Sequence, residues 1–148
     1  MRYWEDVKAG DVVELGCHTM DKERMVAFAR EFDPQPFHTD EKAAEASIWG
    51  GLIASGWLTG SVLMRLFYDG FLKDTASMGS PGIDELRWLK PVRPGDTLTA
   101  RLTMLETAPS RSKPDRGIVR SVNEVLNQHG EIVMSTTGVN FFLRRPGG

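Results

Sequence analysis

Two residues able to take part in proton transfer, Asp33 and His38, stand five positions apart in a segment that also holds Pro34 and Pro36. On a helix, a separation of five residues corresponds to a rotation of about 500° and would point the two side chains in different directions. The prolines disfavour a helical conformation at the residues before them, so we expect a stiff, extended or turning loop in which Asp33 and His38 converge. A carboxylate beside an imidazole can act as a general acid–base pair. Taken singly, the two residues would more often be a turn aspartate and a structural histidine.

A second feature with chemical potential is the glycine-rich entry to an apolar helix expected over residues 57–71. Gly56, near the start of this helix, would have an unpaired backbone N–H aligned with the helix dipole, which suits the stabilisation of an oxyanion. The alternative role for Gly56 is packing. The helix is apolar on nearly every side, a pattern typical of a helix that is buried on all sides. It is shorter than the roughly 20 residues that a membrane span needs.

Shorter helices are expected to position the Asp33–His38 segment. The spacing of Met25 and Ala29 predicts a helix that ends near Phe32, with Thr19 or Asp21 as its N-cap. A short helix is predicted to begin after His38, with Thr39 as its N-cap. Asp40 is then expected to be a solvated carboxylate in the first turn of this helix.

Most of the rest of the chain is predicted to form strands. A first strand is predicted over residues 12–18, and period-two patterns predict four more over residues 82–92, 96–107, 117–128 and 131–144. One strand has an apolar face suited to packing on the helix, formed by Leu98, Ala100, Leu102 and Met104. We therefore predict one α+β domain over residues 1–148, an antiparallel sheet wrapped around a long central helix, which resembles the hot-dog fold. Because such a sheet has open edges, a symmetric homodimer or higher homo-oligomer is expected.

The composition indicates which classes of partner and which cellular compartment to expect. With 18 Lys and Arg against 20 Asp and Glu, the chain lacks the basic excess of nucleic-acid binders. Charged residues stand near the N-terminus where a signal peptide would need an apolar core, and no apolar run approaches the length of a membrane span. We therefore expect a soluble, cytoplasmic protein that binds neither nucleic acid nor membrane. The single cysteine, Cys17, agrees with a reducing compartment and is expected to be a small core residue.

The segment 28–58, FAREFDPQPFHTDEKAAEASIWGGLIASGWL, resembles the hydratase motif of the MaoC-like family of enoyl-CoA hydratases and acyl dehydratases. That motif runs from Phe-Ala through Asp-x-Asn-Pro-x-His-x-Asp to Ile-Ala-x-Gly at the start of the central helix. The resemblance implies that Asp33 and His38 are the catalytic pair and that the backbone N–H of Gly56 faces the thioester oxygen. It also implies an (R)-type hydratase or dehydratase for a 2-enoyl-CoA, in which coenzyme A enters with the substrate and no separate cofactor is needed.

The chemistry of hydration agrees with these residue types. Addition of water to a 2-enoyl thioester needs a base for the attacking water, a proton for the α-carbon and stabilisation of the enolate oxygen. Asp33 could activate the water while His38 orients it and helps to move the proton. The sequence leaves open which of the two residues delivers the α-proton.

Three positions depart from the family motif. Gln35 stands where the motif has Asn, and it is a longer amide able to make the same hydrogen bonds. Ser55 precedes Gly56 where many members have His, and Met64 stands where some members have Ser. We expect Gln35 and Ser55 to belong to the oxyanion and substrate-binding part of the site. Ser61 is either a substitute polar group for the missing serine or a small residue that packs in a buried helix.

Two basic segments are candidates for contacts to the phosphates of coenzyme A. One loop supplies Arg111, Lys113 and Arg116, and a second carries Lys90 and Arg93. The alternative for each is an exposed charged turn. The acyl chain of the substrate cannot be predicted, because its length and branching depend on the shape of the pocket.

Other functions remain open. A hot-dog thioesterase often carries its carboxylate on the central helix, where the only acid of residues 57–71 is Asp69, near the helix end. A metal site built from Asp33, His38 and Asp40 lacks a second histidine nearby, so no metal is predicted. A non-catalytic module that binds acyl thioesters is the remaining alternative.

Overall fold

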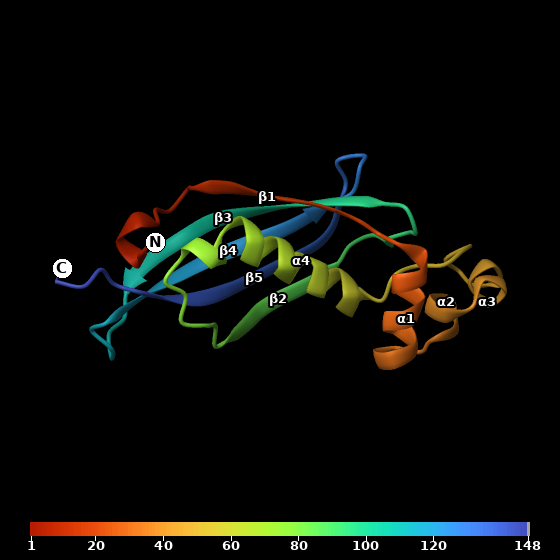
Figure 1. The fold of residues 1–148 in the computed structure, drawn as a ribbon, viewed down its shortest axis with the longest axis horizontal. Helices are drawn as coiled ribbons and strands as arrows, with labels where there is room; N and C mark the ends of the chain where they lie inside the picture. The colour runs from red at the N-terminus through yellow and green to blue at the C-terminus, as the bar shows by residue number, and fades with distance from the viewer. Residues whose placement is uncertain (148) are drawn as a thin grey trace.

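The computed structural model describes residues 1–147, in which a five-stranded antiparallel sheet wraps one long helix (Figure 1). The spatial order of the strands is β1-β3-β4-β5-β2, so β1 and β2 form the two edges. The strands are β1 (Val12–Thr19), β2 (Gly82–Trp88), β3 (Thr97–Pro109), β4 (Arg116–Leu126) and β5 (Ile132–Leu143). The predicted α+β class and the predicted antiparallel sheet are confirmed.

The long helix lies on one face of the sheet, and the shorter helices gather at one end of the molecule (Figure 1). The helices are α1 (Lys22–Phe32), α2 (Pro36–Thr39), α3 (Glu41–Ala46) and α4 (Gly56–Gly70), with short 3-10 turns at Trp4–Asp6 and Leu72–Asp74. The α1–α3 group lies beside the N-terminal end of α4 (Figure 1). None of the helices among residues 1–147 is long and apolar enough to cross a membrane.

Capping residues define the short helices. Asp21 caps α1, since its side chain accepts a hydrogen bond from the backbone N–H of Arg24 at 3.0 Å. The prediction that Thr39 caps the next helix is wrong, because Pro36 starts a separate helical turn that ends at Thr39. The cap of α3 is instead Asp40, an exposed residue whose carboxylate accepts hydrogen bonds from two first-turn N–H groups at 2.9 and 3.2 Å.

The helix α4 buries only one of its faces. The buried residues pack on the inner face of the sheet and are Thr59, Val62, Leu63, Leu66 and Phe67. The apolar face predicted for β3 is also buried there, as Leu98, Ala100, Leu102 and Met104 show. The opposite face of α4 is open, with Trp57, Met64 and Tyr68 between 49% and 60% exposed. The prediction of a helix buried on all sides is therefore wrong for the single chain, because the sheet covers one side only.

Cys17 is exposed, so its predicted place in the core is also wrong. The cause is a register shift between Glu14 and Gly16, which breaks the alternation of β1. After this bulge Cys17 lies opposite Thr99, an exposed residue of the outer face. The sequence alternation alone would have placed Cys17 on the same face as the buried Leu15.

Candidate active site

Asp33 and His38 meet at the end of the molecule formed by α1–α3. Asp33 is the C-cap of α1, and His38 is the third residue of α2. The Oδ2 atom of Asp33 lies 3.2 Å from Nε2 of His38, and the two side chains are only 16% and 6% exposed. The turn of helix that begins at Pro36, rather than an extended loop, brings the imidazole back toward the carboxylate. The structure thus pairs the two residues as expected from the sequence.

A backbone carbonyl fixes the orientation of His38. Its Nδ1 atom lies 2.8 Å from the carbonyl oxygen of Ile53, in the segment that leads into α4. Because a carbonyl oxygen can only accept, Nδ1 carries the proton of this hydrogen bond, and Nε2 is left facing Asp33. The ring edge of Phe37 packs against the imidazole, with 4.6 Å between the ring centroids. His38 is therefore held in one orientation, with Nδ1 toward the Ile53 carbonyl and Nε2 toward Asp33.

Two hydrogen bonds hold the carboxylate of Asp33. Gln35 Nε2 donates to Oδ1 and Ser55 Oγ donates to Oδ2, each at 2.8 Å. Burial alone would raise the pKa of Asp33, but these hydrogen bonds and the neighbouring His38 outweigh it, and the pKa of the carboxyl lies below its ordinary value. The site keeps Asp33 ionised. Gln35 and Ser55 thus contact the carboxylate of Asp33, and their expected role at the oxyanion and substrate stays a prediction.

Ser55 has a second contact that the motif did not reveal. It is fully buried and caps α4, because its Oγ also accepts a hydrogen bond from the backbone N–H of Trp57 at 3.3 Å. One hydroxyl therefore joins the first turn of α4 to the carboxylate of Asp33.

Gly56 is the first residue of α4 and lines the same cavity, of about 320 Å³, as Asp33 and His38. An N–H in the first turn of a helix has no partner within the helix and lies at the positive end of the dipole. The indole of Trp88 covers the α-carbon of Gly56, and its Nε1 donates to the Gly56 carbonyl at 3.0 Å. A Cβ atom at position 56 would overlap this ring. The glycine is needed for the close approach of Trp88 as well as for its place beside the cavity.

Aromatic side chains form part of the cavity wall. Phe37, Trp49, Trp57 and Trp88 line it, and the rings of Trp57 and Trp88 meet edge to face with centroids 5.1 Å apart. Sequence reasoning missed Trp49 as a site residue, and it could not decide between a core role and a pocket role for Trp88. Aromatic residues in a loop and at a strand end fit a core equally well, and no spacing signal distinguishes the two roles.

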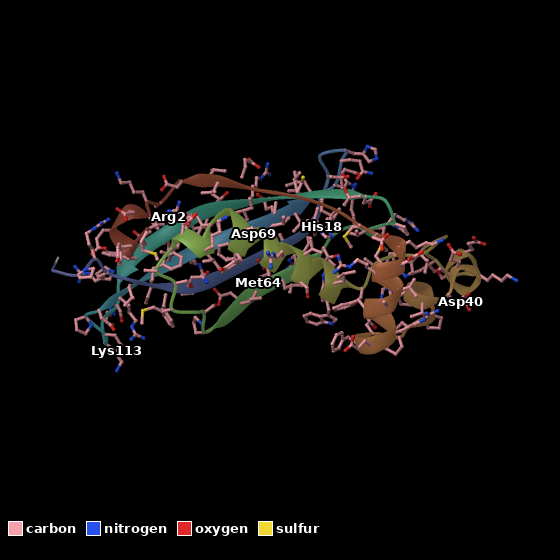
Figure 2. All side chains as sticks on the ribbon, viewed as in Figure 1. Arg2, His18, Asp40, Met64, Asp69 and Lys113 are labelled. Carbon is pink, nitrogen blue, oxygen red and sulfur yellow. The ribbon has the colours of Figure 1, made fainter. Side chains whose placement is uncertain are left out.

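Of the basic residues predicted to contact phosphates, Lys90 alone lines this cavity, where it pairs with Glu131. Arg93 lies nearby and donates to the Trp49 carbonyl at 2.5 Å. Figure 2 shows Lys113 at the end of the molecule opposite Asp40 and the α1–α3 group. The loop of Arg111, Lys113 and Arg116 is therefore not brought to the site of the same chain, and its Arg116 pairs with the adjacent Asp115 at 2.8 Å.

The residues of the alternative sites lie elsewhere. Asp69 is exposed on α4 and forms an ion pair with Arg65 at 2.8 Å, apart from the Asp33–His38 pair. Asp40 caps α3. Within residues 1–147 the structure contains no group of three or more His, Cys, Asp and Glu residues arranged to hold a metal ion.

Met64 and Ser61 lie at a second cavity, of about 550 Å³, between α4 and the strands β2, β4 and β5. Ser61 is exposed, and its Oγ donates to the Trp57 carbonyl at 2.8 Å, so it does not pack in a buried helix. Trp57 lines both this cavity and the one that holds Asp33.

Comparison with known proteins agrees with this architecture. A crystal structure of a MaoC-like dehydratase from Rhodospirillum rubrum is 44% identical, covers 99% of each chain and superposes with a TM-score of 0.91. The protein YdeM of Bacillus subtilis is 30% identical over 125 residues, which are 84% of this chain and 86% of that protein. An (R)-specific enoyl-CoA hydratase from Rhodospirillum rubrum is 26% identical over 117 residues, 75% of each chain. The predicted hot-dog fold is confirmed.

The family model for the MaoC-like domain matches residues 7–125. This range contains β1, all four α-helices and the Asp33–His38 pair. The chain therefore belongs to the MaoC-like family of hydratases and dehydratases.

Proposed function

We propose that this protein reversibly hydrates a 2-enoyl-CoA to the (R)-3-hydroxyacyl-CoA. The observation that carries the proposal is the 3.2 Å contact between Asp33 Oδ2 and His38 Nε2, in one cavity with the N-terminus of α4 at Gly56. The relative named as an (R)-specific enoyl-CoA hydratase supports the choice of thioester and the handedness of the product.

The geometry suggests how the pair would work on a bound water. Asp33 is ionised and accepts a hydrogen bond from the water, while His38 Nε2, whose direction Ile53 fixes, shares the same water. As the water oxygen bonds to the β-carbon, its proton passes to the pair, and the electrons of the double bond move toward the thioester oxygen. The backbone N–H of Gly56 stabilises the resulting enolate, and a proton from the pair then reaches the α-carbon. Dehydration is the reverse.

The same three groups supply the acid, the base and the oxyanion contact, so we propose that the reaction needs no dissociable cofactor. Treatment with a metal chelator, followed by removal of small molecules, should leave the rate unchanged. A rate that falls and is restored by a metal would contradict this part of the proposal.

We also propose a homodimer that pairs the edge strands β2 of two copies. β2 is exposed along most of its length, and Ile83 is 59% and Trp88 46% exposed. The open face of α4, with Trp57 and Met64, is an adjoining apolar surface, since both elements line the second cavity. A two-fold axis would make the two β2 strands antiparallel, so the opposite end of the partner, with its own copy of the basic loop 111–116, would approach this site.

The experiment is a hydration assay with 2-enoyl-CoAs of several chain lengths. Loss of the conjugated thioester absorbance measures the rate, and chiral analysis identifies the configuration of the product. Asp33→Ala and His38→Ala should each lower kcat by about 10²-fold to 10⁴-fold, the usual contribution of a general acid or base, with the fold retained by circular dichroism. Undiminished turnover in either variant would contradict the assignment. Release of free thiol would indicate a thioesterase, and binding without turnover would indicate a binding module.

A further inference from the structure

The inner face of the sheet changes from apolar on β3 to partly polar on β4 and β5. The inward residues of β3 are apolar, whereas β4 and β5 present Ser121, Asn123 and Thr136 on the side that faces α4. All three are buried, and Asn123 lies directly opposite Thr136 in the ladder. Polar side chains on the core face of a sheet depart from the binary pattern of the fold, and such departures are expected at functional sites.

One side-chain atom of this group is fully buried and has no hydrogen-bond partner within residues 1–147. The side-chain oxygen of Asn123 is buried and makes no hydrogen bond within residues 1–147, although the residue is only 8% exposed. A buried polar atom without a hydrogen bond costs free energy, and nearly all such atoms in proteins have a partner. The partner of Asn123 is therefore to be sought among molecules that enter from outside.

The space beside Asn123 can admit such a molecule. Ser121, Asn123 and Thr136 form the polar floor of the second cavity, and Leu63, Met64 and Phe67 of α4 form its apolar wall. Its volume of about 550 Å³ is typical of cavities that hold small ligands. Trp57 lines both this cavity and the cavity of Asp33 and His38, so the two cavities adjoin at this side chain.

We propose that the acyl chain of the substrate extends past Trp57 into this second cavity and carries a hydroxyl group that Asn123, Thr136 and Ser121 bind. The oxygen of Asn123 is an acceptor and needs a donor, which a plain alkyl chain lacks. None of the described residues that line the cavity is Lys, Arg or His, so a carboxylate on the chain would be buried without a cation. This inference rests on the proposed hydratase function and specifies its substrate class.

The test compares pairs of 2-enoyl-CoAs of equal chain length that end in a methyl or a hydroxymethyl group, over five to eight carbons. The wild type should prefer the hydroxylated member in kcat/KM by on the order of tenfold, mainly through KM. Asn123→Leu and Thr136→Val should each reduce this preference, and a third series that ends in a carboxylate should be poor for every variant.

Thr137→Val is the matched control. Thr137 is the next residue of β5 and lies opposite Val122 on the outward face, so the same exchange of hydroxyl for methyl should leave the preference unchanged. Thermal unfolding checks the fold, and Asn123→Leu should not lower the Tm, since it removes an unpaired polar atom. Equal kcat/KM for both members of each pair, or a preference that survives Asn123→Leu, would overturn the inference.

Calorimetric binding of saturated acyl-CoAs with and without a terminal hydroxyl separates this inference from the proposed function. If no 2-enoyl-CoA is hydrated but the hydroxylated ligand still binds more tightly in an Asn123-dependent way, the hydratase proposal fails and the cavity assignment stands. If enoyl-CoAs are hydrated but both ligands bind equally, the cavity assignment fails and Asn123 is satisfied by water.

Discussion

At the scale of single residues, the proposed acid–base pair of Asp33 and His38 depends on neighbours that fix its charge and direction. Gln35 and Ser55 hold the carboxylate of Asp33, and the Ile53 carbonyl turns the ring of His38. The sequence motif identified the pair and its amide neighbour. It could not show that Ser55 bonds to the acid, because the two residues are 22 positions apart and meet only through the packing of α1 on the start of α4.

Ser55→Ala is expected to affect both the fold and the chemistry. Loss of the N-cap should lower the free energy of unfolding by about 0.5–2 kcal/mol. Loss of the hydrogen bond to Asp33 should raise the pKa of that carboxyl and move the acid limb of the pH–rate profile to higher pH. Urea unfolding and a pH–kcat/KM profile measure the two effects. Ser61 is an exposed serine of α4, and the control Ser61→Ala should change neither the free energy of unfolding nor the position of the acid limb. An unshifted acid limb in Ser55→Ala would contradict the role of the Ser55 hydroxyl.

The lowered pKa of Asp33 also predicts how stability depends on pH. A carboxyl whose folded pKa is depressed stabilises the fold above its unfolded pKa of about 4, and this contribution is lost as the pH falls through the folded value. The free energy of unfolding of the wild type minus that of Asp33→Asn should therefore decrease as the pH falls from about 5 to about 3. Urea titrations at several pH values test this. A difference that grows over that range would contradict the direction of the shift, and a His38→Gln background should make the decrease smaller.

At the scale of elements, periodicity predicted the strands and α1 well, because alternation and helical spacing follow from burial on one face. It failed where a local feature overrides the pattern. A bulge in β1 turned Cys17 outward, and Asp40 rather than Thr39 caps α3 because Pro36 opens a turn of its own. The apolar pattern of α4 gave no sign of which side the sheet covers.

The contact between Gly56 of α4 and Trp88 of β2 leads to a prediction about stability. Gly56→Ala should destabilise the fold by about 1–3 kcal/mol, because its Cβ would overlap the Trp88 indole. In a Trp88→Ala background the same change should cost much less, a coupling that a double-mutant cycle of urea midpoints measures. Gly60→Ala is the control on the same helix, since its Cβ would lie 3.4 Å from a flexible Met134 methyl. Equal costs of Gly56→Ala in both backgrounds would contradict the steric role of Trp88.

At the scale of the whole molecule, the two edges of the sheet differ. The β1 edge carries polar residues beside the exposed Val12, whereas the β2 edge carries Ile83 and Trp88 next to the open apolar face of α4. An exposed apolar edge strand favours association, and a two-fold pair is the simplest closed form. The sequence predicted a dimer because the sheet has open edges. The exposed apolar residues of β2 are the reason to propose the β2 edge as the interface.

Ile83→Arg should therefore shift the protein toward a monomer. A charge placed on the β2 edge would be buried between the two copies of the proposed dimer, at a cost well above that of a surface substitution. Light scattering after size-exclusion chromatography measures the mass, and concentration series give the change in Kd. Val12→Arg on the β1 edge is the matched control and should leave the mass unchanged. A dimer that survives Ile83→Arg but not Val12→Arg would place the interface on the other edge.

The double contact of Ser55 has a consequence for how this sequence can diverge. Ser55 is fully buried, and its hydroxyl accepts from the first turn of α4 and donates to Asp33, so within the surroundings of this chain a replacement must be small and must both donate and accept. Few side chains meet these conditions. In this chain, position 55 therefore acts on the stability of the helix and on the charge of Asp33 at once. A lineage that changes it is expected to change the residues around Asp33 in the same step.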